Sequence, residues 1–95
     1  MKSKDAKAES DKLVFKVYEK AGSTGVGKYA ILEDGIVLIF KDRPDYYLYT
    51  FITPGKPYVR QMWNFAEAGE GLNTYVNQKI RNNYADRWIP ELAEL

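Results

Sequence analysis

The sequence predicts an α+β domain, in which an antiparallel meander of three or four strands is followed by two C-terminal helices packed on one face of the sheet. In the first half of the chain, apolar and polar residues alternate between turn residues, which is typical of paired strands. In the second half, Gly69-Glu70-Gly71 separates two apolar stripes of helical period. A chain of 95 residues is long enough for one core only.

Two segments precede the central hairpin. Residues 1–11 are small, polar and charged without an apolar period, so they predict a disordered lead that adds nothing to the core. Leu13 to Tyr18 has the alternation and β-branched content of a half-buried strand, but the residues do not reveal its partner. We therefore expect a single domain over residues 12–89 and a C-terminal tail over residues 90–95.

The next strands are expected to form a hairpin. Lys28 to Glu33 and Ile36 to Phe40 read as antiparallel strands, joined by Asp34-Gly35 as a two-residue turn with positive φ angles. Asp42 to Asp45, which contains a proline, predicts a second turn that leads into the next strand at Tyr46.

The strand Tyr46 to Ile52 carries four aromatic residues in seven positions. Alternation sends Tyr47, Tyr49 and Phe51 to one face and the intervening residues to the other, so both faces are rich in apolar surface. The segment is therefore either a core strand or a recognition face.

Two helices are expected after this strand. Pro57 suits a first helical turn, so the first helix is predicted over Tyr58 to Ala68 and the second over Leu72 to Tyr84. Trp88-Ile89 is expected to fold back onto the domain. The predicted buried stripes are Val59, Met62, Trp63 and Ala66 in the first helix, and Leu72, Tyr75, Val76 and Ile80 in the second.

Composition excludes several classes of function. The chain has no cysteine and no histidine, so it lacks thiolate metal ligands, a cysteine nucleophile and the usual general base. The carboxylates lie mostly in predicted turns, which do not provide a catalytic cleft. We expect no enzyme activity, no catalytic residue, no metal and no cofactor. Because no apolar run approaches the ~20 residues of a membrane span, a soluble cytoplasmic protein is the default.

The charge balance gives no general preference for nucleic acid. The formal net charge is +1, and the segment Met1 to Lys12 accounts for all of that excess. A protein that binds the phosphate backbone normally carries a basic surplus, so here only local clustering of bases could supply one.

Several pieces of the chain between Tyr29 and Tyr84 occur in a characteristic order. They are the hairpin Ile31 to Phe40, the Y-x-Y strand Tyr47-Leu48-Tyr49, a proline-containing connection into Tyr58-Val59, the break Ala66 to Gly71, and Tyr75-Val76-Asn77 followed by Ile80-Arg81 and Tyr84. In this order the chain resembles the KTSC family, short domains found at the C-terminus of some lysyl-tRNA synthetases and as small bacterial or phage proteins. The chain departs from the usual Val-Pro pair of that family, with Thr53-Pro54 and a second proline at Pro57. The synthetase context of the family implies RNA binding as an expectation.

The second predicted helix offers a candidate binding surface. Lys79 and Arg81 are its only charges, and the amide of Asn77 lies four residues before Arg81, so these two side chains point the same way. Arg60 on the first helix could widen this surface, which has the chemistry to bind phosphates and base edges. The alternative is a solvated helix face with a structural role for Asn77 and Arg81.

Tyr47 and Tyr49 are candidates for stacking on unpaired bases, with core packing as the alternative. Gly22 to Lys28 has the glycine and lysine spacing of a phosphate loop, but Tyr29 replaces the Ser or Thr and the next segment reads as a strand, so nucleotide binding is not expected.

These observations predict a small, non-catalytic binding module. The first hypothesis is that it binds RNA or single-stranded nucleic acid through Asn77, Lys79, Arg81 and Arg60. The alternative is a protein-interaction module, for instance a phage or accessory factor that binds a larger protein, using exposed aromatic residues. No membrane partner is expected.

Overall fold

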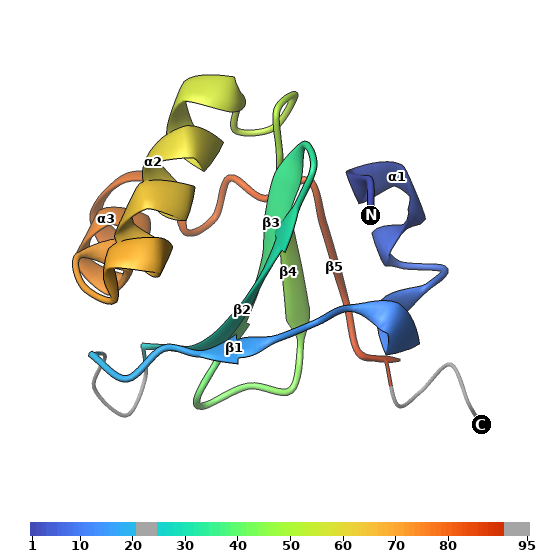
Figure 1. The fold of residues 1–95 in the computed structure, drawn as a ribbon, viewed down its shortest axis with the longest axis horizontal. Helices are drawn as coiled ribbons and strands as arrows, with labels where there is room; N and C mark the ends of the chain where they lie inside the picture. The colour runs from blue at the N-terminus through green and yellow to red at the C-terminus, as the bar shows by residue number, and fades with distance from the viewer. Residues whose placement is uncertain (21–24, 91–95) are drawn as a thin grey trace.

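The computed structural model describes residues 1–20 and 25–90, and these form one antiparallel sheet of five strands with helices (Figure 1). The α+β class is confirmed. The strands follow one another across the sheet in chain order, as in a meander. Their bounds are β1 Lys16–Val17, β2 Val26–Leu32, β3 Gly35–Phe40, β4 Tyr46–Thr50 and β5 Asp86–Trp88. The predicted number of three or four strands is too low, because β5 follows the helices and pairs with the outer edge of β4.

The β2–β3 hairpin is present, but its turn lies one residue earlier than predicted. Leu32 pairs with Gly35, which leaves Glu33 and Asp34 as the turn residues. Neither Asp34 nor Gly35 has a positive φ angle. Gly35 is required for a different reason, since a Cβ atom at this position would lie 2.5 Å from the carbonyl oxygen of Tyr49 in β4. The glycine is therefore needed for the close approach of the β3 and β4 backbones, and not for an unusual turn conformation.

The predicted alternation along β4 is confirmed. Tyr47 and Tyr49 are buried on the helix-covered face of the sheet, and Phe51 packs beside them. Leu48 is buried on the opposite face, where Tyr46 also packs. Both faces of this strand are therefore covered, each by a different part of the chain.

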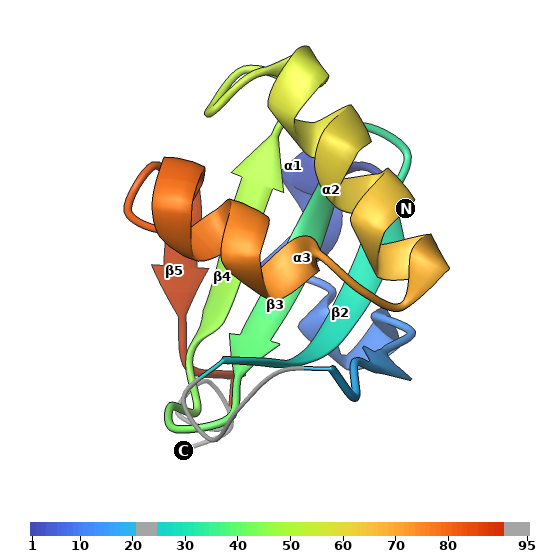
Figure 2. The same cartoon turned by 90° about the vertical axis from the view of Figure 1, so that its left-hand side faces the viewer.

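The helices cover one face of the sheet (Figure 2). Helix α2, Lys56–Ala68, buries the predicted residues Val59, Met62 and Ala66. It ends at Gly69, whose φ of 77° is the left-handed conformation of a glycine C-cap. Gly71 also has a positive φ and a Cβ there would lie 2.7 Å from the ring of Phe65.

The second helix is shorter than predicted. Helix α3, Leu72–Tyr75, continues as a π-helix over Val76–Ile80 and does not reach Tyr84. An α-helix would pair the carbonyl of Arg81 with the N–H of Ala85. Instead, the Arg81 carbonyl accepts a hydrogen bond from the Tyr49 hydroxyl at 2.9 Å, and the Ala85 N–H donates to Leu48 in β4. Contacts with the sheet therefore end the helix.

The N-terminal segment covers the other face of the sheet, where the sequence predicted a disordered lead. Helix α1, Ser3–Ala6, places the fully buried Ala6 against the sheet, and a 3-10 turn follows at Ser10–Lys12. Met1, Leu13 and Phe15 pack around the same cluster. In Figure 1, α1 and the helices α2 and α3 lie on opposite sides of the sheet.

Polar contacts with the hairpin turn hold this segment. The backbone N–H and the hydroxyl of Ser3 both donate to the Asp34 carboxylate, at 2.6 and 2.7 Å. The Met1 carbonyl accepts a hydrogen bond from the N–H of Glu33. These partners are about thirty residues distant along the chain, so no local pattern indicates the contact.

The predicted strand Leu13 to Tyr18 is reduced to Lys16–Val17, which pairs with Lys28 and Tyr29 of β2. The alternation of this segment is retained, with Leu13 and Phe15 on one face of the sheet and Tyr18 on the other. Val17 is 64% exposed, whereas Tyr18 is buried on the helix side and accepts a hydrogen bond from the N–H of Leu72.

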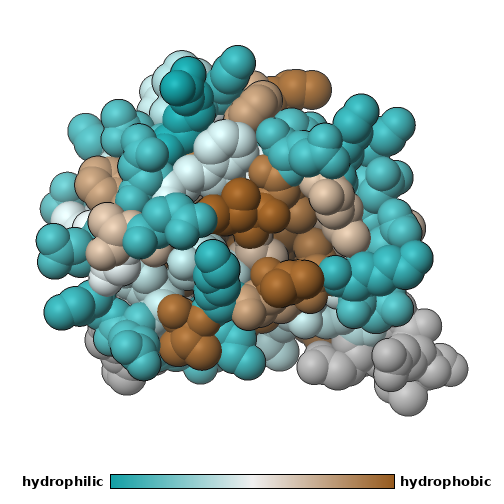
Figure 3. Space-filling view, in the orientation of Figure 1, coloured by the Kyte–Doolittle hydropathy of each residue, from teal (hydrophilic) through white to brown (hydrophobic). Residues whose placement is uncertain are grey.

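The surface mixes apolar and polar areas. On the face shown in Figure 3, apolar side chains gather near the middle and hydrophilic side chains surround them. None of the helices within the described ranges has both the length and the apolar content that a membrane crossing needs.

We predict that Asp34→Ala loosens the N-terminal segment, because both Ser3 donors lose their acceptor. The free energy of unfolding should fall by about 1 kcal/mol or less, since the carboxylate is partly exposed to solvent. The N–H of Glu33, which bonds to Met1, should exchange with solvent faster. Urea unfolding and hydrogen exchange measure the two effects. Asp11→Ala, at an exposed position of the same segment, is the control, and equal exchange of Glu33 in both variants would contradict the prediction.

The same contact should depend on pH. Burial raises the pKa of the Asp34 carboxyl, but the hydrogen bonds from Ser3 and the charge of Lys2 outweigh burial and hold the pKa below its ordinary 3.8. A lowered carboxyl pKa stabilises the folded state above pH ~4, and this stability is lost as the pH falls through the folded pKa. The wild type should therefore lose the protection of Glu33 in acid more than Asp34→Ala does.

Candidate functional site

The candidate site lies at the end of the sheet where β2 begins and β3 ends. The register places Val26 opposite Phe40 and Lys28 opposite Ile39, so Gly27 is the extra residue of a β-bulge. Bulges commonly redirect side chains near binding sites. Beyond the last pair, the N–H of Lys41 donates to the carbonyl of Gly25 at 2.9 Å, which continues the pairing past the end of β3.

A hollow of about 370 Å³ opens beside this bulge. We call it the basic notch, and it is lined by Gly27, Lys28, Ile39, Phe40, Lys41 and Arg43. Three of these six residues carry a positive charge, and none of the described lining residues is acidic. A Cβ atom on Gly27 would lie 3.0 Å from the Cγ of Lys41, so the glycine leaves room for the lysine stem.

Arg81 approaches this end of the sheet from the helix side. Its guanidinium lies over the ring of Phe40, 4.4 Å from the ring centroid, which is cation–π geometry. Phe40 also lines the basic notch, but its buried ring lies on the helix-covered face. Lys28 and Ile39 share the face of Tyr46, so Arg81 and the notch lie on opposite faces of the sheet.

A series of hydrogen bonds positions Arg81. Its Nη1 donates to the Oδ1 of Asn77 at 2.9 Å, and Asn77 donates in turn to the Oδ1 of Asn73 at 3.2 Å. The same oxygen of Asn73 accepts the N–H of Val26 at the start of β2, at 3.2 Å. Asn73 therefore joins the helix to the sheet, and Asn77 orients Arg81, which agrees with the structural alternative for this pair.

A row of aromatic rings that begins at Phe40 packs on the helix-covered face of the sheet. Phe40 and Tyr47 meet edge to face at 5.1 Å between centroids, and Tyr47 and Tyr84 do so at 5.2 Å. The guanidinium of Arg87 lies over Tyr47 and Tyr84 at 6.0 and 5.9 Å, and its Nε is 3.6 Å from the carboxylate of Asp45. This end of the sheet thus combines guanidinium groups with a packed aromatic row.

Tyr47 and Tyr49 do not present free faces. Tyr47 is 5% exposed and Tyr49 is fully buried, so both belong to the core, as the alternative interpretation proposed. Burial raises the pKa of the Tyr49 hydroxyl, which stays neutral and donates to the Arg81 carbonyl. Neither ring is available for stacking on a base.

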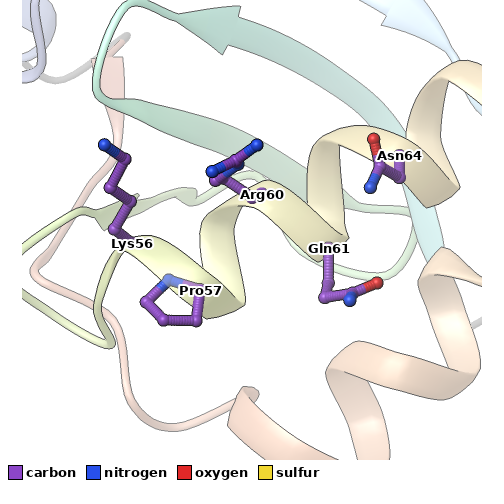
Figure 4. A pocket seen from close by; sticks show the side chains of 5 residues that line it. All are labelled: Lys56, Pro57, Arg60, Gln61 and Asn64. Carbon is purple, nitrogen blue, oxygen red and sulfur yellow. The ribbon is translucent and has the colours of Figure 1, made fainter.

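Arg60 and Lys79 lie apart from the Asn77 and Arg81 pair. Arg60 belongs to an open hollow of about 460 Å³ that residues of α2 alone line (Figure 4). Figure 4 shows Arg60 and Lys56 extending from one side of this helix, away from Gln61. Lys79 is exposed and lies two residues from both Asn77 and Arg81, so it points to the other side of its helix. The structure therefore brings together only part of the predicted surface.

The sequence analysis missed Lys28, Lys41 and Arg43 as site residues. The predicted hairpin contained the relevant signal, because antiparallel pairing brings the start of its first strand and the end of its second strand together. Lys28 and Lys41 stand at these two positions. The bulge at Gly27, which opens the hollow between them, has no clear signature in the sequence.

The segment with phosphate-loop spacing differs from a true phosphate loop. Gly22, Ser23 and Thr24 lie outside the described residues. Gly27 and Lys28 belong to β2, whereas a phosphate loop leads into the N-terminus of a helix. Lys28 is therefore a strand residue whose charge contributes to the basic notch.

Comparison of the chain with protein-family models, with curated proteins and with solved structures finds no match. The resemblance to the KTSC family stays a prediction based on its residues. The function is accordingly argued from the geometry of the site.

We predict that Asn73→Ala lowers the free energy of unfolding by about 1–3 kcal/mol, because the buried N–H of Val26 loses its acceptor. Urea unfolding measures the effect. Asn82→Ala, at an exposed position after the same helix, is the control and should change stability by less than about 0.5 kcal/mol. Equal stability of the two variants would show that the hydrogen-bond series does not hold the helix to the sheet.

Proposed function

We propose that this domain is a small, non-catalytic binding module that holds the phosphate backbone of RNA or single-stranded nucleic acid at the basic notch. The observation that carries the proposal is the convergence of Lys28, Lys41 and Arg43 on one hollow without an acidic lining residue. The proposed setting is the cytoplasm.

The notch supplies two kinds of phosphate ligand. Arg43 offers a planar fork of N–H donors that matches phosphate oxygens, and the two lysines offer point charges. The apolar side chain of Ile39 lines the same hollow, and low polarity beside a charge strengthens its attraction to an anion.

Acidic residues near this end of the sheet reduce the local surplus of positive charge but do not remove it. Asp45 is engaged by Arg87, and Asp42 lies between Lys41 and Arg43 in the chain. A chain that is neutral beyond its first twelve residues can thus still present a local positive surface, which is the condition that backbone binding requires. The resemblance to the KTSC family supports the same proposal.

We predict that Lys28→Gln combined with Arg43→Gln weakens binding of a labelled single-stranded RNA about tenfold or more at low salt. Each lost phosphate contact should also reduce the slope of log affinity against log salt by about 0.7. Fluorescence anisotropy across a salt series measures both quantities. The matched control is Arg60→Gln combined with Lys79→Gln, which removes the same charge from surfaces outside the notch.

Each outcome of this comparison decides between sites. If only the control pair weakens binding, the helix surface inferred from the sequence is the site and the notch is not. If the wild type shifts none of several RNA and DNA strands in a low-salt gel titration, nucleic-acid binding is rejected.

A protein-interaction module is the second candidate, and exposed aliphatic side chains favour it. Ile52 is 91% exposed in the loop after β4, and Val14 is 78% exposed before β1. A pull-down from lysate with and without nuclease separates the two candidates, because partners captured through nucleic acid disappear after digestion. A partner that survives digestion and is lost with Ile52→Asp would favour the protein-interaction module.

A further inference from the structure

We infer that a second copy of this chain binds at the edge of the sheet formed by β1 and β2. The contact surface, which we call the edge surface, is a hollow of about 220 Å³ lined by Val14, Lys16, Tyr29, Ile31 and Glu67. It shares no residue with the basic notch. The inference therefore goes beyond the proposed function and does not depend on it.

The helices cover their face of the sheet incompletely at this edge. Helix α2 packs on β3 and β4, and Ile36 of β3 is fully buried. Ile31 lies opposite Ile36 on the same face but is 39% exposed, and Val14 is 78% exposed. Figure 1 and Figure 2 place β1 and β2 at the edge that faces the viewer in Figure 1, and Figure 3 shows apolar side chains gathered on that side. Exposed apolar side chains that gather in this way mark an interaction site.

The size of the hollow favours a protein side chain as its occupant. Small-molecule pockets begin at roughly 300 Å³, and this hollow is smaller. An aliphatic side chain that protrudes from another protein surface would fit it. Val14 protrudes from the edge surface itself, so a second copy of the chain supplies such a side chain.

The charges of the edge surface are complementary to themselves. The Nζ of Lys16 lies 3.8 Å from the carboxylate of Glu67, and both side chains are more than half exposed. Across a two-fold axis the same surface meets itself, so Lys16 of each copy can face Glu67 of the other. A partner surface of one sign would attract one of these residues and repel the other. The formal net charge of +1 also gives little repulsion between two copies.

The first test is sedimentation of the full chain over a range of concentrations up to about 1 mM, because small interfaces form weak complexes. The wild type should change from monomer to dimer as the concentration rises. Val14→Asp should weaken dimerisation about tenfold or more, because it places a charge in the apolar part of the contact. Ile52→Asp adds the same charge at a residue that is 91% exposed in the loop after β4, and this control should dimerise as the wild type does.

The second test reverses the charges. Lys16→Glu and Glu67→Lys each place like charges across the two-fold axis, so each variant alone should dimerise more weakly than the wild type. An equimolar mixture of the two variants brings opposite charges together at both contacts, so it should associate more tightly than either variant alone. An ion pair that acts only within one chain would not be restored by mixing.

Three results would overturn the inference. The first is a wild type that stays monomeric up to about 1 mM. The second is dimerisation that Ile52→Asp weakens and Val14→Asp does not. The third is a mixture of the two charge variants that associates no better than either variant alone. Binding of RNA is not measured in these experiments, so their outcome and that of the notch variants are independent.

Discussion

The close pairing of β3 with β4 is the constraint on which the rest of the structure depends. Gly35 lets the two backbones approach where any side chain would collide with the Tyr49 carbonyl. The pair then carries apolar residues on both faces, so each face must be covered from elsewhere in the chain. Helices α2 and α3 cover one face, and the N-terminal segment covers the other.

Strand β4 of this pair also ends the second helix. The Tyr49 hydroxyl in β4 donates a hydrogen bond to the Arg81 carbonyl, and the Leu48 carbonyl accepts one from the Ala85 N–H. The backbone therefore leaves the helix and enters β5. This exit leaves the Arg81 side chain over Phe40 and brings Arg87 over the rings of Tyr47 and Tyr84. Core packing therefore sets the positions of these two guanidinium groups.

Overall charge is a poor guide to the surface of this domain. Several acids are engaged with partners away from the notch, for example Asp34 with Ser3 and Glu67 with Lys16. The bases of β2 and the turn after β3 converge because the strands pair, and a bulge at Gly27 opens a hollow between them. A local positive surface can thus arise in a nearly neutral protein from pairing alone.

The sequence by itself determined the local structure: the faces of β4, the buried stripe of α2, and the glycine that ends it at Gly69. These features follow from side-chain period and from backbone conformations that few residues adopt, which are properties of short segments. Of the candidate site, it indicated that Asn77 and Arg81 lie on the same side of a helix. Only the tertiary structure decided that residues 1–15 cover one face of the sheet, that a fifth strand pairs with β4, and that Lys28 and Arg43 line one hollow. These features depend on contacts between segments that are distant in the chain.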